Sequence, residues 1–159
     1  WECEIGPDDT VIDLYFKKIY QPAVDSVLEV VELYRKGNPP RIVADESEAS
    51  YERRCTARHA KVEWNRPVGQ VYNLIRGTNP APGAHTTYQG AKLGIFDAAR
   101  VPGDGISSRV RAITDDGIEV QCVGGRVLVK RVRPDGGDKV PATDWAQSVG
   151  LKPGDEFGT

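Results

Sequence analysis

The second half of the chain consists of short segments of alternating apolar and polar residues, separated by turns that contain glycine. The dipeptides Gln89-Gly90 and Asp116-Gly117 each lie between two such segments, and Gly124-Gly125 separates IEVQCV from RVLVKRV. Alternation with a period of two indicates strands, and a glycine-containing dipeptide between two strands is typical of a hairpin. Several short strands at this spacing predict a small β-barrel or sandwich.

The first part of the chain has a mostly helical periodicity. The opening WECEI alternates like a half-buried strand and ends at Gly6-Pro7. Residues 10–20 and 23–36 then repeat apolar positions every three or four residues, which predicts two amphipathic helices. Thr10 and Asp13 form an approximate capping box for the first helix, Pro22 can start the second, and Gly37 ends it.

An irregular segment and one more helical pattern lie between these helices and the strands. Residues 39–60 contain paired prolines, an acidic run and the basic run RRCTARH, which is typical of a linker on the surface. The basic run is a solvated face in the simpler interpretation and a binding patch in the alternative. Pro67 and Gly77 then bracket a short helix that leads into the β-rich part.

Length and composition exclude several classes of protein. The chain of 159 residues has the length of one ordinary domain or two small ones, and no apolar run approaches the roughly 18 residues that a membrane span needs. We therefore expect a cytoplasmic protein that does not span a membrane. The three cysteines are odd in number and widely spaced, which fits reduced thiols better than a disulfide framework or a zinc site. Because the chain begins at Trp1 and contains no methionine, we expect it to be part of a longer polypeptide.

One long stretch resembles a known family. IRGTNPAPGAHTTYQGAKLGIFDA is similar to the signature of the C-terminal domain of the methionyl-tRNA formyltransferase family, in which an Ile-Arg pair, a Pro-x-Pro-Gly-Ala turn and a strand carrying Lys-Leu recur. Upstream, IGPDDTVIDLY, PRIVADESEASYERR and AKVEWNRPVGQVYNLIRG resemble the end of the formyl-transfer domain, the linker and the helix that follows it. Downstream, DDGIEVQCVGGRVLVKRVRPDGGDKVPATDW and GLKPGDEFG resemble the end of the C-terminal domain.

The resemblance implies an α+β fold in three parts. Residues 1–38 would be the tail end of a Rossmann-like formyl transferase domain, with an N-terminal strand plus two helices. Residues 39–60 would be the linker, and residues 61–159 an open OB-like β-barrel with its own leading helix. Most of the sheet that the two helices cover in the family is missing, so their apolar faces need a cover. The expected cover is the missing N-terminal catalytic half, a self-associated copy, or the barrel itself.

The resemblance also implies that the catalytic groups are elsewhere. The family uses an Asn and a His in an Asn-x-His motif and an Asp just before the strand equivalent to ECEI. This sequence has no Asn-x-His, and that Asp would fall before Trp1. Formyl transfer needs a base for the attacking amine and donors for the oxyanion. We therefore expect no catalytic, cofactor-binding or metal-binding residue here, and an inactive chain whose role is substrate positioning and interdomain support.

The family members use 10-formyltetrahydrofolate or act on it, so this cofactor is implied for the full-length parent. The formyl acceptor stays open between methionyl-tRNA, a sugar nucleotide, a carrier-bound substrate and water. His85 stands where the family commonly has Trp or Tyr, and we expect its ring to pack like that aromatic. Asp115 and Asp116 precede Gly117 at a hairpin tip, where turn chemistry explains them better than a metal site.

Basic residues give an alternative function. Residues 1–59 carry eight Lys/Arg against twelve Asp/Glu (net −4), whereas residues 60–159 carry thirteen against eleven (net +2). A stand-alone module that binds tRNA or another nucleic acid would use the cations on the strands, because phosphates are bound by Lys and Arg. These candidates are Arg109, Arg111, Lys130, Arg131 and Arg133. Nearby acidic residues favour a solvated edge, and the aromatics available for stacking on bases are few: Tyr88, Phe96, Trp145 and Phe157. A scaffold whose acidic helical part docks a partner is the third hypothesis.

Overall fold

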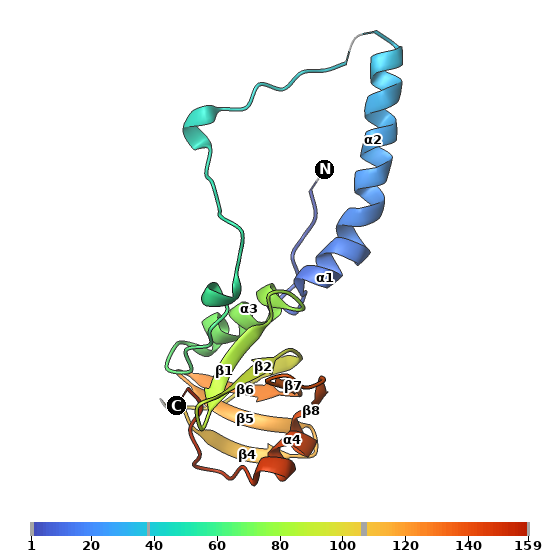
Figure 1. Cartoon of the computed structure of the whole chain (residues 1–159). Coiled ribbons are helices and arrows are strands. Elements are labelled where there is room, and N and C mark those ends of the chain that lie inside the picture. Colours follow the sequence, from blue (N-terminus) through green and yellow to red (C-terminus); the bar gives the residue numbers. More distant parts are fainter. Residues whose placement is uncertain (1, 38, 106–107, 159) are drawn as a thin grey trace. The chain divides into compact units, whose positions relative to one another are not determined.

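The computed structural model describes residues 2–37, 39–105 and 108–158. The chain divides into two compact units, a helical unit (Trp1–Arg54) and a β unit (Cys55–Thr159). Figure 1 shows both, coloured along the sequence. Each unit is described by itself below. The expected boundaries at residues 38 and 60 stay a prediction.

The helical unit contains one uninterrupted helical run. Helix α1 (Val11–Asp13), a π-helical segment (Leu14–Ile19) and helix α2 (Tyr20–Arg35) follow one another directly. The capping box expected at Thr10 and Asp13 is present.

The expected break between two helices is wrong. Pro22 has no N–H to donate to the carbonyl four residues earlier, which would interrupt a regular α-helix at this point. A π-helical turn precedes it instead, with the N–H of Tyr20 bonded to the carbonyl of Tyr15. A π-turn of this kind accommodates the local mismatch without ending the helix.

The N-terminal strand expected in WECEI is also wrong. Residues 2–6 have no strand, and Ile5 is 61% exposed. A strand needs a neighbouring strand for its backbone groups, and the described part of the helical unit contains no sheet. Lys18 holds this segment instead, since its Nζ donates to the carbonyl of Glu4 at 2.8 Å and to Oδ2 of Asp9 at 2.6 Å.

A helix opens the regular part of the β unit, as the sequence predicts. Helix α3 (Val68–Thr78) begins directly after Pro67 and runs through Gly77, so the expected stop falls one residue early. Two short 3-10 turns, Glu46–Glu48 and Ala57–His59, lie in the irregular segment before it. The buried face of α3 carries Val71, Tyr72 and Ile75.

The strands of the β unit form two antiparallel sheets. The first has the order β1-β2-β7-β8, and the second has the order β3-β6-β5-β4. Their bounds are β1 Ala84–Tyr88, β2 Ala91–Ile95, β3 Ala98–Val101, β4 Val110–Thr114, β5 Gly117–Cys122, β6 Gly125–Val129, β7 Arg131–Pro134 and β8 Val140–Pro141. Helix α4 (Ala142–Val149) follows β8. The α+β class is confirmed, whereas an OB-like barrel stays a prediction.

The three expected hairpins are present, two of them shifted by one residue. Gln89 and Gly90 form the β1–β2 turn with positive φ values of 50° and 78°. The second turn is Asp115-Asp116, because Thr114 pairs with Gly117. The third is Val123-Gly124, because Cys122 pairs with Gly125. The glycine after each of these two turns is therefore a strand residue, placed where another backbone or side chain comes close.

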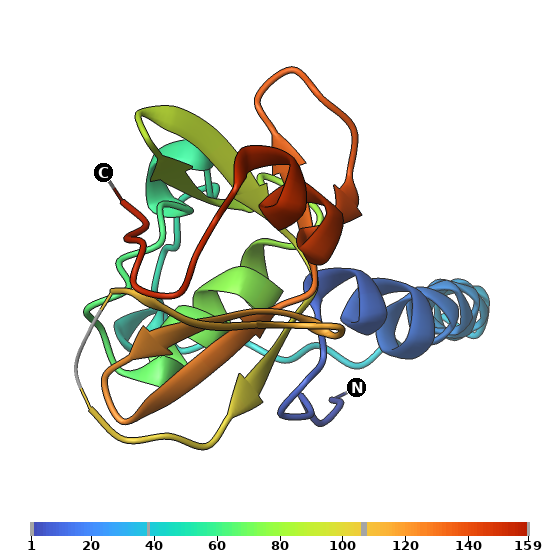
Figure 2. The ribbon, with the colours of Figure 1, turned by 90° about the horizontal axis from the view of Figure 1, so that it is seen from below.

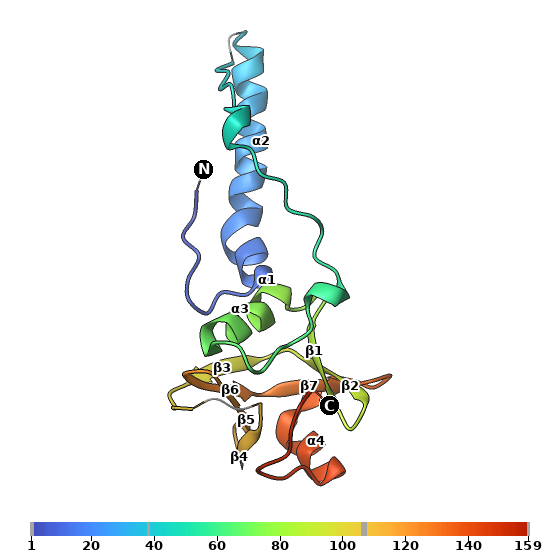
Figure 3. The same cartoon turned by 90° about the vertical axis from the view of Figure 1, so that its left-hand side faces the viewer.

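One hydrophobic core lies inside the β unit. Figure 3 shows α3 on one side of the strands and α4 on the other, and Figure 2 shows α4 (red) toward the viewer with α3 (green) behind. Ile95, Ile118 and Val127 are fully buried between them. Four aromatic rings extend this core, with neighbouring centroids 5.5–6.2 Å apart: Trp64, Tyr88, Trp145 and Phe157. Among the described residues, no helix has the length and apolar character of a membrane span.

Candidate nucleic-acid interface

The five basic residues predicted to bind nucleic acid lie on two different sheets. Arg109 precedes β4 and Arg111 lies within it, in the second sheet. Lys130 joins β6 to β7, and Arg131 and Arg133 lie on β7 in the first sheet. The pair on β7 flanks the buried Val132, so both side chains point to the outside of the sheet.

Three of the five already contact other groups of the protein. Arg109 donates to the carbonyl of Gly154 at 3.0 Å and lies 3.5 Å from a carboxylate oxygen of Glu156, which ties β4 to the C-terminal segment. Arg131 donates to the carbonyl of Lys139 at 3.3 Å. The guanidinium carbon of Arg133 lies 5.2 Å from the centre of the Phe96 ring. These contacts reduce what each side chain can offer to a phosphate.

Arg111 and Lys130 are exposed, and neither forms an ion pair within the described residues. They present their charge to solvent, but Arg111 lies on β4 whereas Lys130 lies in the connection between β6 and β7. A phosphate-binding surface depends on clustered cations. The predicted set therefore contains two available cations and no compact cluster.

Two lysines missed from the sequence share a surface with Arg133. Lys139 Nζ lies 3.7 Å from the centre of the Phe96 ring, which the guanidinium of Arg133 also contacts. Lys92, Arg133 and Asp135 line a hollow of about 350 Å³ together with Gly94 and the loop 134–137. Only the pairing of β2 with β7 brings these residues together, and no short motif in the sequence indicates it.

The aromatic residues considered for base stacking are not accessible. The exposed fractions of Tyr88, Phe96, Trp145 and Phe157 are 8%, 3%, 7% and 3%. Stacking on a base requires an open ring face. These four rings serve the core and its edge, so the β unit has no stacking platform built from them.

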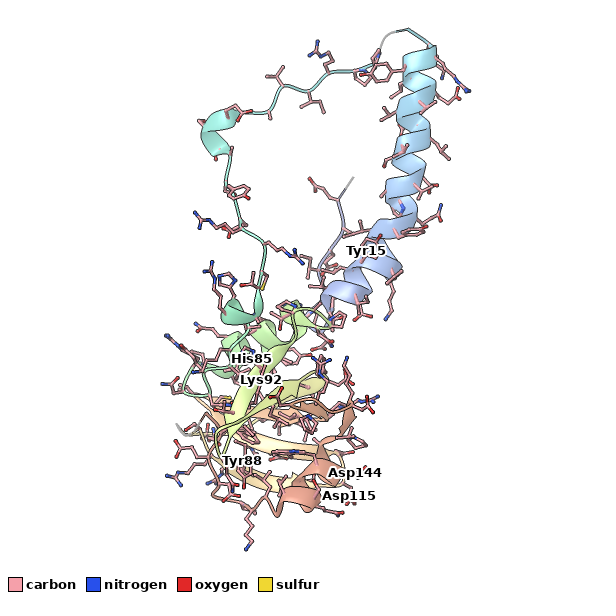
Figure 4. The ribbon with its side chains drawn as sticks, viewed as in Figure 1. Tyr15, His85, Tyr88, Lys92, Asp115 and Asp144 are labelled. Carbon is pink, nitrogen blue, oxygen red and sulfur yellow. The ribbon has the colours of Figure 1, made fainter. Side chains whose placement is uncertain are left out.

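His85 lies in β1 opposite Gly94 of β2. Figure 4 shows it close to Lys92. Its Nδ1 is buried and has no hydrogen-bond partner among the described residues. Burial, followed by the charge of Lys92, lowers the pKa of the imidazole below its ordinary 6.5. The neutral ring this favours is consistent with the expected packing role.

Asp115 and Asp116 form the two-residue turn between β4 and β5. Asp115 and Asp144 line a hollow of about 290 Å³ with Thr114, Thr143 and Gln147, and Figure 4 labels both carboxylates. The described residues include no group of three His, Cys, Asp or Glu side chains able to hold a metal ion. Cys3, Cys55 and Cys122 are free thiols in this structure.

The β unit matches a known family over most of its length. Residues 54–150 match the family described as "Formyl transferase, C-terminal domain". This chain belongs to that family. The resemblance seen in the sequence is thereby confirmed.

Particular relatives cover nearly the whole chain. The chain is 29% identical to cytosolic 10-formyltetrahydrofolate dehydrogenase of Xenopus laevis over 93% of its own length and 18% of that protein. It is 30% identical to methionyl-tRNA formyltransferase of Moorella thermoacetica over 97% of its length and 50% of that protein. The chain thus spans about half the length of this formyltransferase and about a fifth of the dehydrogenase.

The fold has solved counterparts. A crystal structure of HypX from Aquifex aeolicus in complex with tetrahydrofolic acid matches with a TM-score of 0.71 and 18% identity, over 91% of this chain and 26% of that one. At this identity the match concerns the fold alone.

Proposed function

We propose that this chain is the C-terminal part of a 10-formyltetrahydrofolate-dependent formyltransferase-family protein. In that protein it positions the formyl acceptor and supports the contact between domains, and the catalytic Asn, His and Asp belong to the part that precedes it. The dehydrogenase relative is named cytosolic, which supports a cytoplasmic location. The cofactor 10-formyltetrahydrofolate belongs to the full-length parent.

The apolar face of the helical run carries this proposal. None of the residues of α1, the π-helical segment or α2 is buried. Phe16 and Leu28 are 64% and 61% exposed, and Val24, Val27 and Val31 are exposed as well. A contiguous exposed apolar surface of this kind is typical of an interaction site.

The length of the relatives indicates what covers this face. The methionyl-tRNA formyltransferases that match extend to about twice this chain. The missing N-terminal catalytic half is therefore the proposed partner, and a self-associated copy takes its place when this chain is alone. The β unit needs no such cover, because its own core is closed by α3 and α4.

Formyl transfer by the separated parts tests the catalytic side of the proposal. This chain alone should show neither transfer from 10-formyltetrahydrofolate nor its hydrolysis, whereas a parent that includes the preceding half should show one of them. Turnover by purified 1–159 would contradict the proposal that the chain is inactive, whether or not mutation of His59 and His85 abolishes that turnover.

Self-association tests the structural side. We expect Leu28→Glu to shift the isolated chain toward monomer in light scattering, because it places a charge on the apolar face. Glu29→Gln is the matched control on the neighbouring exposed position and should leave the mass unchanged. Hydrogen exchange within 11–35 should be slower in the associated form than in the Leu28→Glu variant. If the wild-type chain is monomeric and its helix exchanges slowly, the apolar face of the helix does not need another copy or the missing half to cover it.

A nucleic-acid-binding role is the second candidate, and the exposed, unpaired Arg111 and Lys130 favour it. In this case tRNA binding should weaken with salt and be abolished by charge reversal at Lys130 and Arg131. Reversal at Lys36, outside the β unit, is the control. The absence of binding at low salt would exclude this function.

A further inference from the structure

The basic run RRCTARH and the residues after it border a hollow in the β unit. The hollow measures about 450 Å³ and is formed by three consecutive pieces of chain, namely the 3-10 turn Ala57–His59, the segment 61–66 and helix α3. Its lining consists of Arg58, His59, Lys61, Glu63, Arg66, Gln70, Val71 and Leu74. Pockets that bind small ligands commonly have volumes of roughly 300–1,000 Å³.

The segment that carries Lys61 is held rigidly against the first sheet. Ala60, Val62 and Trp64 are buried, so the residues between them face outward. Backbone hydrogen bonds join Val62 N–H to the carbonyl of His85 at 2.8 Å and His85 N–H to the carbonyl of Ala60 at 2.9 Å. Lys61 therefore points to the rim of the hollow from a fixed backbone.

Positive charge exceeds negative charge around this hollow. Three cations, Arg58, Lys61 and Arg66, face one carboxylate, Glu63, which leaves a surplus of two (3 − 1). The carboxylate is engaged, because Arg66 Nε donates to Glu63 Oε2 at 2.7 Å. Arg58 Nε lies 3.1 Å from Nε2 of His59. Both arginines use Nε in these contacts, and within the described residues their terminal Nη groups form no hydrogen bond or ion pair.

The remaining lining consists of Gln70 and two apolar residues. Val71 is buried and Leu74 is half-buried, and both line the hollow from α3. Guanidinium groups match the geometry of phosphate oxygens, and lysine adds a point charge. We propose that this hollow binds a small organic phosphate of nucleotide size, with the phosphate at Arg58, Lys61 and Arg66 and the apolar part of the ligand against Leu74. The proposal is independent of formyl transfer and of the missing half.

Calorimetric titration of the whole chain with AMP at low salt tests this site. We expect saturable 1:1 binding that weakens about tenfold or more in the double variant Arg58→Gln/Lys61→Gln, because two charge-assisted contacts are lost. The double variant Lys36→Gln/Lys152→Gln removes the same charge from exposed positions that do not line the hollow and should bind AMP as the wild type does.

The apolar wall is tested separately. Leu74→Ala should weaken AMP binding and leave pyrophosphate binding unchanged, since pyrophosphate has no part to place against the wall. Thermal unfolding of each variant shows that the β unit is still folded. Equal weakening by the two double variants, or AMP binding that does not saturate below about 1 mM, would overturn the proposal. Neither result bears on the activity or the association of the parent protein.

Discussion

The hydroxyl of Tyr88 donates a hydrogen bond to Oδ2 of Asp155, 3.0 Å away and 67 residues further along the chain. The same oxygen accepts from the backbone N–H of Lys152 at 2.9 Å. The Tyr88 ring also packs edge-on against Trp145 and Phe157. A single side chain thus joins β1 to the C-terminal segment that follows α4.

Replacing Tyr88 with Phe keeps the ring packing and removes only the hydroxyl. We expect the free energy of unfolding to fall by about 1–2 kcal/mol, as is usual for a hydrogen bond to a charged group near the surface. Urea denaturation measures this difference. Tyr20→Phe is the matched control, because Tyr20 is 51% exposed, and its effect should be within about 0.5 kcal/mol. Equal losses in the two variants would contradict a specific role for the bond to Asp155.

The same tyrosine makes stability depend on alkaline pH. Burial, and next the hydrogen bond to Asp155, raise the pKa of Tyr88 above its ordinary 10.0. The folded chain keeps this proton longer than the unfolded chain, so the contribution is complete below pH 10 and is lost as the pH rises through the folded pKa. The unfolding free energy of the wild type should therefore fall more steeply above pH 10 than that of Tyr88→Phe. Parallel curves would exclude this linkage.

Local patterns predicted much of the β unit because its strands and turns are specified by nearby residues. The turn at Gln89-Gly90 needs two positive φ values, and glycine in such a dipeptide is its usual signal. The same signal puts the other two hairpin turns one residue late, because Gly117 and Gly125 are strand residues and not turn residues. In the strand each of these glycines leaves space for a neighbouring group that is distant in sequence, so the local pattern does not indicate this role.

Contacts between distant segments could not be predicted in the same way. The sequence pattern groups Arg109 with Arg131 as a phosphate ligand, but the structure pairs Arg109 with Glu156 through an isolated β-bridge between the two residues. No local pattern indicates Lys139, because its position over Phe96 follows from the packing of the first sheet. The strand expected in WECEI failed for the same reason, since alternation indicates a strand only where a partner strand exists.

Gly117 and Gly77 should respond in opposite directions to substitution by alanine. A Cβ on Gly117 would lie 2.2 Å from the carbonyl oxygen of Val129, and its φ is 145°. Gly117→Ala should therefore lower the unfolding free energy by about 3 kcal/mol or prevent folding. Gly77 lies in α3, where the added carbon would meet no atom within 4 Å beyond its chain neighbours and the helix's own backbone, and Gly77→Ala should stabilise by about 0.5–1 kcal/mol. Denaturant unfolding of both variants measures the two changes in unfolding free energy. Equal changes would contradict the prediction.

The three thiols should differ sharply in reactivity. Burial raises the pKa of Cys122 to about 12, and its side chain is fully buried in the core. Cys55 is exposed and Cys3 is intermediate. Because the thiolate is the reactive form, titration of the native chain with a disulfide reagent at pH 8 should label Cys55 first and leave Cys122 unlabelled until denaturant is added. Cys55→Ser should remove the fast phase, and rapid labelling of Cys122 in the native chain would contradict the closed core.

His85 gives a prediction at the acidic end of the pH range. Its pKa is lowered by burial and then by Lys92, so the folded chain binds this proton less well than the unfolded chain. The contribution is complete above pH 6.5 and is lost as the pH falls toward the folded pKa. His85→Phe should remove this loss of stability between about pH 7 and pH 5. His59→Gln is the control, because His59 is exposed, and this variant should keep the wild-type loss of stability at acidic pH.

At pH 8 the same variant tests whether the ring acts by packing. Nδ1 of His85 is buried without a hydrogen-bond partner among the residues that the structure describes, and such a group costs about 1 kcal/mol or more. Phenylalanine keeps an aromatic ring at this position of β1 and removes that atom, so the unfolding free energy should rise by about 1 kcal/mol. If His85→Phe instead lowers the unfolding free energy at pH 8, the imidazole makes a polar contact that a packed aromatic ring cannot replace. The packing role would then be wrong.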